Sequence, residues 1–319
     1  MQSFETLSKK FAEHFDVRHF PAQPASLYDP NDYFLRLGGK KIRPILCLMG
    51  NELFDEINPD AWHAATAIEL FHNFTLIHDD IMDAAPLRRG NETVHAKYNG
   101  NTALLAGDVM LVKAYEYLNK INKPFLHKVL LLFNKTAIEV CEGQQLDMDY
   151  EKQNEVSLTD YLRMIELKTS VALAASLQVG ALLGGAGERN QNLLYEFGRK
   201  LGIAFQIQDD YLDAFGDPEK FGKQVGGDIL ANKKTFLLIH ALQTSSEKKV
   251  LEKLIKGNEK DKVDKVQKIF RNCKADEWAL QLKNKYLDEA LAHLEDIAVL
   301  SKRKEPLKEL AHFLFKRES

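Results

Sequence analysis

Apolar residues recur every three or four positions along most of the chain, which is the spacing of one face of an α-helix. In residues 61–83 this stripe runs through Ala64, Ile68 and Phe71 and reaches Met82. The same spacing predicts further helices over residues 101–119, 125–141, 158–183 and 193–212. No stretch alternates polar and apolar residues for long enough to indicate a sheet, so the sequence predicts an all-α protein of roughly ten or more helices.

Helix-breaking residues divide these segments. Proline is absent between Pro124 and Pro218, which leaves room for long helices. Loops are predicted at residues 31–40, 84–101, 184–190 and 217–233. From residue 245 to residue 317 the chain is rich in lysine and glutamate at helical spacing, which predicts a solvated outer set of helices.

The composition is that of an ordinary globular protein. Of 319 residues, 45 % are hydrophobic and 28 % are charged, and the formal net charge is −3. This balance gives no reason to expect nucleic acid or an anionic membrane as a partner, so a bound anion must be held by local positive charge. Cys47, Cys141 and Cys273 are far apart and odd in number, which favours a reducing compartment. Residues 1–13 are polar and no run of 18 apolar residues is present, so we expect no signal peptide, no membrane span and a cytoplasmic protein.

Two aspartate clusters with the same DDxxD spacing each follow an apolar helical segment. The clusters are DDIMD, with Asp79, Asp80 and Asp83, and DDYLD, with Asp209, Asp210 and Asp213. Aspartates four residues apart share a helix face, where they repel one another and oppose the helix dipole unless a cation is bound. Hard ions such as Mg²⁺ take oxygen ligands and complete their shell with water and substrate phosphate. An exposed acidic helix end is the alternative for either cluster alone, and it explains the pair poorly.

Basic residues accompany the first cluster. The segment GGKKIRP, residues 38–44, places Lys40 and Arg43 on a glycine-led loop that enters a helix, where backbone and dipole favour an anion. Arg88 and Arg89 follow DDIMD, and arginine forks suit phosphate oxygens. His72 precedes Asp79 by seven residues, two helical turns along the same face.

Basic residues also accompany the second cluster. Lys168 lies within an otherwise apolar helical segment, and Lys223 and Lys233 lie on the glycine-rich loop after DDYLD. Each lysine or histidine by itself is more often solvated or packed than functional. Together with two carboxylate clusters, however, they provide what is needed to hold a diphosphate.

Several segments match a known family in their order and separations: GGKKIRP, LIHDDIMDAAPLRRG, GQQLD, KTS, FQIQDDYLDAFGD, GKQVGGDI and NKK. On these motifs the chain resembles the trans-isoprenyl diphosphate synthases. The resemblance implies one prenyltransferase domain over residues 1–319, with a motif-bearing core at about 34–238 and outer C-terminal helices at 245–319. It also implies an all-α fold of antiparallel helices around a deep central cavity, usually in a homodimer.

The resemblance assigns roles position by position. The metal ligands are Asp79, Asp83 and Asp209, supported by Asp80, Asp210 and Asp213. The positions that match isopentenyl diphosphate contacts are Lys40, Arg43, His72 and Arg89. Those on the allylic-diphosphate side are Arg88, Lys168, Thr169, Gln206, Lys223 and Lys233, above a polar network of Gln144 and Asp147. Many relatives have Asp-Asn-Lys where this chain has Ala231-Asn232-Lys233, so Lys234 is an alternative to Lys233.

The implied reaction is the Mg²⁺-dependent 1′-4 head-to-tail condensation of isopentenyl diphosphate with dimethylallyl, geranyl or farnesyl diphosphate, with three Mg²⁺ ions per active site when substrate is bound. Three other classes fit less well. A terpene cyclase would carry an NSE/DTE-type second cluster and no GGKxxRP loop. A head-to-head synthase would show DxxxD pairs. A non-catalytic partner subunit often loses one aspartate cluster, and both are intact here.

Product length is predicted from the residues before DDIMD. Phe74 and Thr75 lie five and four residues before Asp79, roughly 6–7.5 Å along the helix. This chain has one aromatic residue with a small neighbour at these positions and no insertion within DDxxD. In these respects it resembles the archaeal-type geranylgeranyl (C20) synthases of the family. We therefore favour a C20 product over a farnesyl (C15) one. The alternative is that Phe74 packs in the core.

Overall fold

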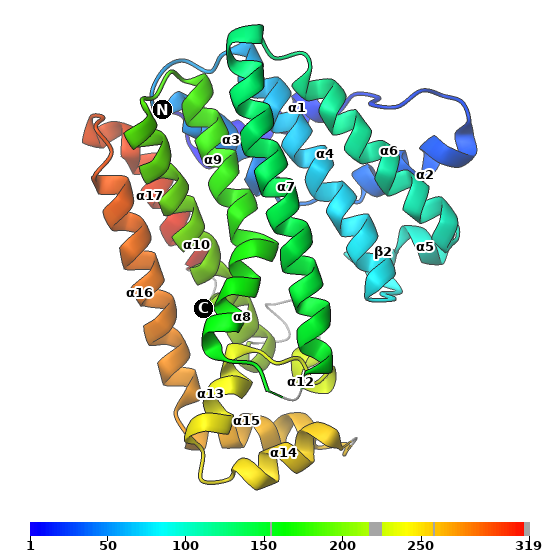
Figure 1. Ribbon diagram of the computed structural model, residues 1–319, viewed down its shortest axis with the longest axis vertical. Coiled ribbons are helices and arrows are strands. Elements are labelled where there is room, and N and C mark those ends of the chain that lie inside the picture. Colours follow the sequence, from blue (N-terminus) through cyan, green and yellow to red (C-terminus); the bar gives the residue numbers. More distant parts are fainter. Residues whose placement is uncertain (154, 217–224, 258, 316–319) are drawn as a thin grey trace. The chain divides into compact units, whose positions relative to one another are not determined.

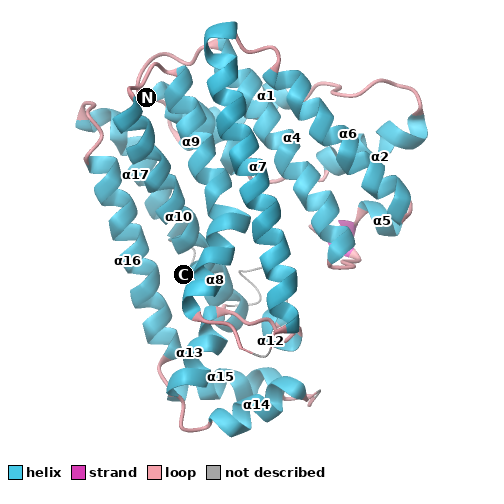
Figure 2. Cartoon of the chain, viewed as in Figure 1, coloured by secondary structure: helices cyan, strands magenta, loops and turns pink. Residues whose placement is uncertain are grey.

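The computed structural model describes residues 1–153, 155–216, 225–257 and 259–315. The regular structure of these residues is helical apart from one two-stranded hairpin (Figure 2). Structure and structural relatives confirm the predicted all-α class. Contacts between Cα atoms divide the chain into two compact units, described in turn below. The first comprises residues 1–134, 175–194 and 298–306, and the second comprises residues 135–174, 195–297 and 307–319.

Six helices and the hairpin lie wholly within the first unit. They are α1 (Phe4–Phe15), α2 (Ala25–Arg36), α3 (Ile42–Glu52), α4 (Pro59–Met82), β1 (Leu87–Arg88), β2 (Asn91–Glu92), α5 (Val94–Lys97) and α6 (Gly100–Leu118). Four further helices contribute residues to both units: α7 (Lys123–Lys152), α9 (Val171–Leu183), α10 (Glu188–Phe215) and α17 (Ser301–Phe315).

Helix α4 is the central element of the first unit. Asn58 caps its first turn by accepting a hydrogen bond from the backbone N–H of Ala61, and Pro59 occupies the first turn, where its missing N–H costs nothing. The helix packs against α3 and lies alongside α6 (Figure 1). Buried apolar residues extend along the helix as far as Ile77, and its C-terminal turn carries DDIMD, in which Asp80 is buried and Asp83 is exposed.

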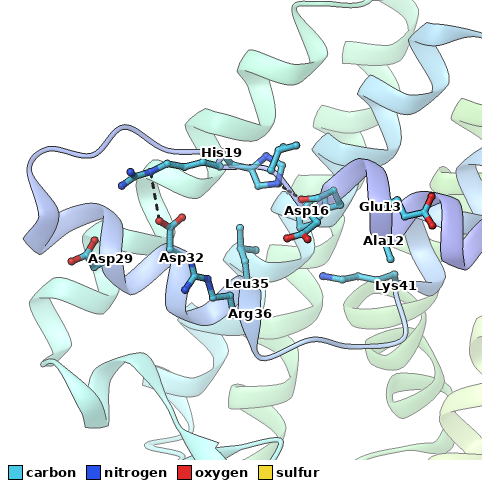
Figure 3. A pocket seen from close by; sticks show the side chains of 12 residues that line it. Ala12, Glu13, Asp16, His19, Asp29, Asp32, Leu35, Arg36 and Lys41 are labelled. Carbon is cyan, nitrogen blue, oxygen red and sulfur yellow. Dashed lines mark hydrogen bonds and ion pairs between the residues drawn. The ribbon is translucent and has the colours of Figure 1, made fainter.

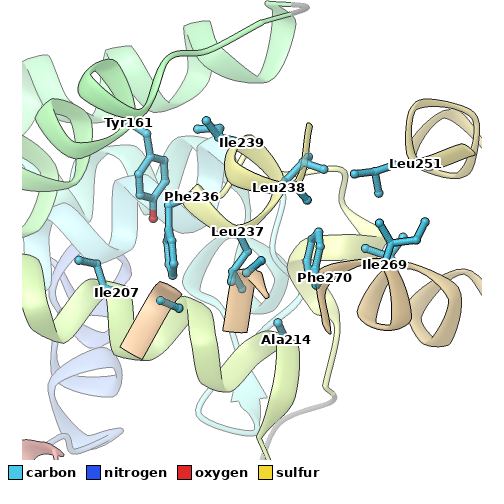
Figure 4. Close-up of a cluster of buried hydrophobic side chains, with 14 of the residues drawn as sticks. Tyr161, Ile207, Ala214, Phe236, Leu237, Leu238, Ile239, Leu251, Ile269 and Phe270 are labelled. Carbon is cyan, nitrogen blue, oxygen red and sulfur yellow. The ribbon is translucent and has the colours of Figure 1, made fainter. Parts of the chain in front are cut away.

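The second unit contains the remaining elements. They are α8 (Leu158–Ile165), a π-helical turn η1 (Glu166–Ser170), α12 (Gly227–Leu230), α13 (Phe236–Thr244), α14 (Lys248–Lys256), α15 (Lys262–Asn272) and α16 (Ala275–Glu295). Its core gathers side chains from α8, α10, α13 and α15. Figure 4 shows Tyr161, Ile207, Phe236, Leu237 and Phe270 in this cluster.

Part of the lysine- and glutamate-rich C-terminal region belongs to that core. Leu251, Val266, Ile269 and Phe270 are all at most 4 % exposed. Helices α14 and α15 pack against each other and against α13 (Figure 1). The region is therefore amphipathic rather than wholly solvated. Among its many polar residues, apolar residues recur at three- and four-residue spacing and form a buried face.

Several predicted boundaries are wrong. Residues 31–36, predicted as loop, belong to α2, because burying Phe34 outweighs the helix-breaking effect of Pro30. The predicted loop at 84–101 contains the hairpin and α5, and α10 starts inside the one at 184–190. Residues 217–224 of the last predicted loop lie outside the described residues, and α12 occupies part of the rest.

One segment is long and apolar enough to cross a membrane by length and composition alone. This segment is Leu158–Leu183. Of its most apolar 18-residue stretch, 78 % is buried inside the protein, as in the core helix of a globular protein. The described residues thus contain no clear membrane span. Within this segment the predicted helix 158–183 is interrupted by η1, which carries Lys168 and Thr169. Such π-helical turns occur frequently at functional sites.

Candidate active site

The β1–β2 hairpin returns Arg88 to the end of α4. Nε of Arg88 donates to both carboxylate oxygens of Asp80, at 2.8 and 2.9 Å, and Nη2 lies 3.4 Å from Oδ2 of Asp79. Burial raises the pKa of Asp80, while the hydrogen bond and charge of Arg88 oppose this rise. Asp80, the middle residue of the cluster, is therefore held by an arginine that sequence reasoning placed near the diphosphate.

Asp79 and Asp83 lie on consecutive turns of the helix end. The backbone N–H of Asp83 donates to the carbonyl of Asp79 at 2.9 Å. This helical hydrogen bond keeps the two residues one turn apart on the same face of the helix. Asp83 is exposed and Asp79 half-buried. Carboxylates placed this way can offer oxygen ligands to an ion from solvent.

Arg43 and His72 meet at one turn of α3 and α4. Nη1 of Arg43 lies 3.1 Å from Nε2 of His72. Burial lowers the pKa of His72 well below its ordinary value, and the neighbouring cations lower it further. Burial also lowers the pKa of Arg43 to about 10, with Glu69 opposing. A charged Arg43 thus donates to a neutral His72, which then carries its own proton on Nδ1.

The guanidinium of Arg89, from the turn of the β1–β2 hairpin, lies against the glycine-led loop. Gly39 has a φ of +139°, and a Cβ there would come within 2.8 Å of Nη2 of Arg89. A side chain there would displace the guanidinium, and the positive φ itself favours glycine. The structure therefore brings together Arg89 and Gly39, whose next residue is Lys40, just as it brings together Arg43 and His72.

Lys41 makes a contact that the sequence did not predict. Its Nζ donates to Oε1 of Glu69 at 2.7 Å, and Nδ2 of Asn73 donates to the same oxygen at 2.8 Å. Lys41 has a left-handed backbone, with a φ of 51°, and it is half-buried whereas Lys40 is exposed. A glutamate and an asparagine within an apolar helix are the signal that could have indicated this network.

In the second cluster, Asp210 is buried and held from two sides. The hydroxyl of Tyr161 donates to its Oδ2, and Nε2 of Gln206 donates to its Oδ1 at 3.0 Å. Burial raises the pKa of Asp210 to about 8, and the charge of Asp228 adds to the rise. Tyr161 was not predicted as a site residue, because a tyrosine among apolar residues is typical of a core position.

Asp213 ties the end of α10 to the following turn. Its Oδ2 accepts the backbone N–H of Asp228 at 2.9 Å, and its carbonyl accepts the N–H of Gly226 at 2.6 Å. Asp209 precedes Asp213 by one helical turn on the same face, and both are half-buried. The first and last aspartates of DDYLD are thus less buried than the middle one.

Five further predicted residues of the second unit line a common cavity of about 150 Å³, namely Asp147, Lys168, Thr169, Gln206 and Lys233. Nζ of Lys168 donates to Asp147 at 2.5 Å, and the hydroxyl of Thr169 donates to Gln206 at 3.4 Å. Other lining residues are Asp210, Asp228 and Lys234. Nζ of Lys234 donates to the carbonyl of Glu151 at 2.9 Å.

Two predicted residues of this unit stand apart. Nε2 of Gln144 is buried and has no hydrogen-bond partner within the described part of the chain. Lys223 lies outside the described residues.

A larger cavity of about 770 Å³ lies in the first unit, among α1, α2 and the residues between them. Figure 3 shows its lining of mixed charge, including Asp16, Asp32, Arg36 and Lys41. None of the predicted metal or diphosphate residues lines it. The candidate chemistry is therefore located at the helix ends rather than in the larger hollow.

The donor set fits Mg²⁺. Among the residues that the structure describes, no group of three or more carboxylate, imidazole or thiol side chains could by itself hold a metal ion. Mg²⁺ commonly takes one or two protein carboxylates and completes its shell with water and substrate phosphate. Carboxylates beside arginine and lysine suit an ion shared with a diphosphate better than a closed structural site.

These features define an all-α enzyme class in which aspartate-bearing helix ends and nearby arginines and lysines serve diphosphate chemistry. A model of the polyprenyl synthetase family matches residues 24–273. A short chain isoprenyl diphosphate synthase of Methanocaldococcus jannaschii is 42 % identical over 251 residues, covering 77 % of this chain and 76 % of that protein. A geranylgeranyl diphosphate synthase of Methanosarcina mazei is 44 % identical over 223 residues, covering 69 % of each.

A crystal structure of a geranylgeranyl pyrophosphate synthase superimposes with a TM-score of 0.95 at 42 % identity, covering all of both chains. The chain belongs to the polyprenyl synthetase family, and it is a prenyltransferase. The family predicted from the motifs is confirmed. Its members are generally Mg²⁺-dependent and typically homodimeric.

Proposed function

We propose that this chain catalyses the Mg²⁺-dependent head-to-tail condensation of isopentenyl diphosphate with allylic diphosphates and releases all-trans geranylgeranyl diphosphate. The observation that carries the proposal is that each intact aspartate cluster has basic side chains beside it. Arg88 binds Asp80 and approaches Asp79, while Lys168 and Lys233 line the same cavity as Asp210.

Asp79, Asp83 and Asp209 would hold the metal, with three ions per active site when substrate is bound. When bound, Mg²⁺ neutralises the charge that builds on the leaving diphosphate, which is commonly the largest catalytic contribution. Asp80, Asp210 and Asp213 act through other groups, because Arg88, Tyr161 and the Asp228 backbone already bind them.

Lys40, Arg43, His72 and Arg89 would bind isopentenyl diphosphate. The charge of Arg43 attracts the anion, and because its Nη1 donates to Nε2 of His72, the Nδ1 proton of that neutral ring is available as a further donor. The contact between Gly39 and Arg89 brings a second guanidinium to the same loop. Fixed donors of this kind orient the double bond for attack.

Arg88, Lys168, Thr169, Gln206, Lys223 and Lys233 would bind the allylic diphosphate. Its C1–O bond breaks, and the electron pair leaves with the diphosphate. The double bond of isopentenyl diphosphate then forms the new bond to C1, and the proton on its C2 passes to the departing diphosphate. No protein base is required, so the residues bind, orient and exclude water from the carbocation.

Phe74 supports the C20 product. Its half-buried ring lies 5.8 Å from the ring of Phe71 and 4.8 Å from the ring of His78. The hydroxyl of Thr75 donates back to the His72 carbonyl at 2.8 Å, so the neighbouring side chain is small and folded onto the helix. One aromatic ring at this level is what we propose ends the growing chain.

Exposed apolar side chains support a homodimer. Leu104, Leu105 and Val112, all on α6, are 50 %, 57 % and 61 % exposed. We infer that a second copy of the chain covers them. The three cysteines are free thiols, which fits the proposed cytoplasmic location.

The test is product analysis with the purified chain. Labelled isopentenyl diphosphate would be supplied with dimethylallyl, geranyl or farnesyl diphosphate and Mg²⁺, and the products identified by mass. All three primers should yield mainly the C20 diphosphate. No condensation with any primer would refute the reaction, and a C15 product would refute the chain length alone.

A further inference from the structure

Lys262, the first residue of α15, is a buried lysine with neutral partners. It is 1 % exposed, and its Nζ donates to Oδ1 of Asn232 at 2.6 Å and to the carbonyl of Ile255 at 3.0 Å. Within the described ranges, both hydrogen-bond acceptors of this ammonium are uncharged. Burial lowers its pKa. A buried cation without a carboxylate partner is costly, so its position calls for a physical reason.

Its partner Asn232 has an uncommon backbone and precedes a proposed diphosphate ligand. Asn232 has a φ of 59°, a backbone angle that residues other than glycine rarely adopt. The next residue is Lys233, whose backbone N–H donates to the Asp228 carbonyl at 2.9 Å and whose side chain lines the cavity with Asp210. The direction in which Lys233 leaves the backbone therefore depends on the conformation of Asn232.

Helix α15 meets the same turn at a second point. Gly226 has a φ of +83°, and a Cβ there would come within 2.5 Å of Cγ1 of Val263, the residue after Lys262. On its other side the turn is tied to DDYLD, because Asp213 accepts the backbone N–H groups of Gly226 and Asp228. Residues 226–233 thus run between the aspartate helix and α15, with contacts to both.

We propose that Lys262 is a positioning residue for allylic-diphosphate binding: through Asn232 it fixes the left-handed turn that directs Lys233 into the cavity. The proposal rests on the proposed role of Lys233. It gives α15, which was predicted to be one of the outer helices, a role in positioning a substrate-binding residue. Isopentenyl diphosphate binding does not depend on this turn, since its proposed contacts lie in residues 40–89.

The experiment compares KM values for the two substrates in the full-length enzyme. Lys262→Met should raise the KM for the allylic diphosphate about tenfold, as for a lost charge-assisted hydrogen bond, and leave the KM for isopentenyl diphosphate unchanged. Asn232→Ala, at an exposed position, should give the same split without disturbing the core. Asn232→Asp keeps an acceptor and tolerates the left-handed backbone, so it should keep a near-normal KM.

Rescue distinguishes positioning from general support. Glycine adopts a positive φ without a side-chain anchor, so adding Asn232→Gly to Lys262→Met should restore most of the allylic KM. The matched control is Lys265→Met on the same helix, where an exposed lysine pairs with Glu259 and Asp261 at 2.5 and 3.1 Å. This control should change neither KM.

Two results separate the inference from the proposed function. If Lys233→Ala leaves the allylic KM unchanged, the assigned role of Lys233 is wrong and the role of Lys262 fails with it. If Lys233→Ala raises that KM while Lys262→Met and Asn232→Ala stay within about twofold of wild type, the inference alone is overturned. An equal rise in both KM values, or no rescue by glycine, would also overturn it.

Discussion

Replacing Phe74 by alanine should lengthen the product by about one five-carbon unit. The next aromatic ring toward the core is Phe71, whose centroid lies 5.8 Å from that of Phe74. Phe71 is three residues earlier on α4, about 4.5 Å along the axis at 1.5 Å per residue. Without the Phe74 ring, the growing chain would meet Phe71 less than one helical turn further along. We therefore expect C25 to replace C20 as the main product.

The substitution should leave a folded enzyme. Truncating a fully buried phenylalanine costs roughly 3–5 kcal/mol, and the half-buried Phe74 should cost about 1–3 kcal/mol. Product mass would be measured with farnesyl diphosphate as primer, beside thermal unfolding. Phe74→Leu, which keeps part of the bulk, should give a mixture of C20 and C25. An unchanged product profile in a folded Phe74→Ala protein would show that this ring packs in the core and does not set the length.

Three further outcomes are expected. Asp79→Ala and Asp209→Ala should each lower kcat by orders of magnitude at saturating Mg²⁺ with little change in unfolding temperature, and near-normal turnover in either would exclude a metal-ligand role. Burial raises the folded-state pKa of Asp210 to about 8, so the folded protein binds more protons than the unfolded chain between about pH 4 and 8, and stability should fall as pH rises through that window. Asp210→Asn should flatten this fall in metal-free thermal unfolding, and an unchanged slope would contradict the shift. Leu105→Glu should yield monomers in sedimentation if α6 forms the dimer contact, whereas an intact dimer would place the interface elsewhere.

The long helices and the aspartate motifs could be read from the sequence because both depend on local spacing. Residues four apart share a face in any helix, so the side-by-side placement of Asp79 and Asp83 needed no tertiary information. The same holds for the apolar stripe of α4. Helix α2 was missed because its stability comes from burying Phe34, which outweighs Pro30. That burial is a tertiary effect and leaves no local pattern.

The contacts that hold the candidate site were not predictable in the same way. The sequence gives no distance between Tyr161 and Asp210, which are 49 residues apart, or between Lys262 and Asn232, which are 30 apart. A tyrosine in an apolar helix and a lysine in a charged one look ordinary until folding brings their partners to them. Motif matching predicts the candidate ligands, whereas the side chains that would orient them depend on packing.

The central claim is that each aspartate cluster is required for metal-dependent diphosphate binding, and calorimetric titration with an unreactive allylic diphosphate analogue tests it most directly. We expect the wild-type chain to bind the analogue with Mg²⁺ and to lose nearly all binding with a chelator, and we expect Asp79→Ala and Asp209→Ala each to weaken the Mg²⁺-dependent binding strongly. Equal binding with and without Mg²⁺, or full binding in either variant, would contradict the claim.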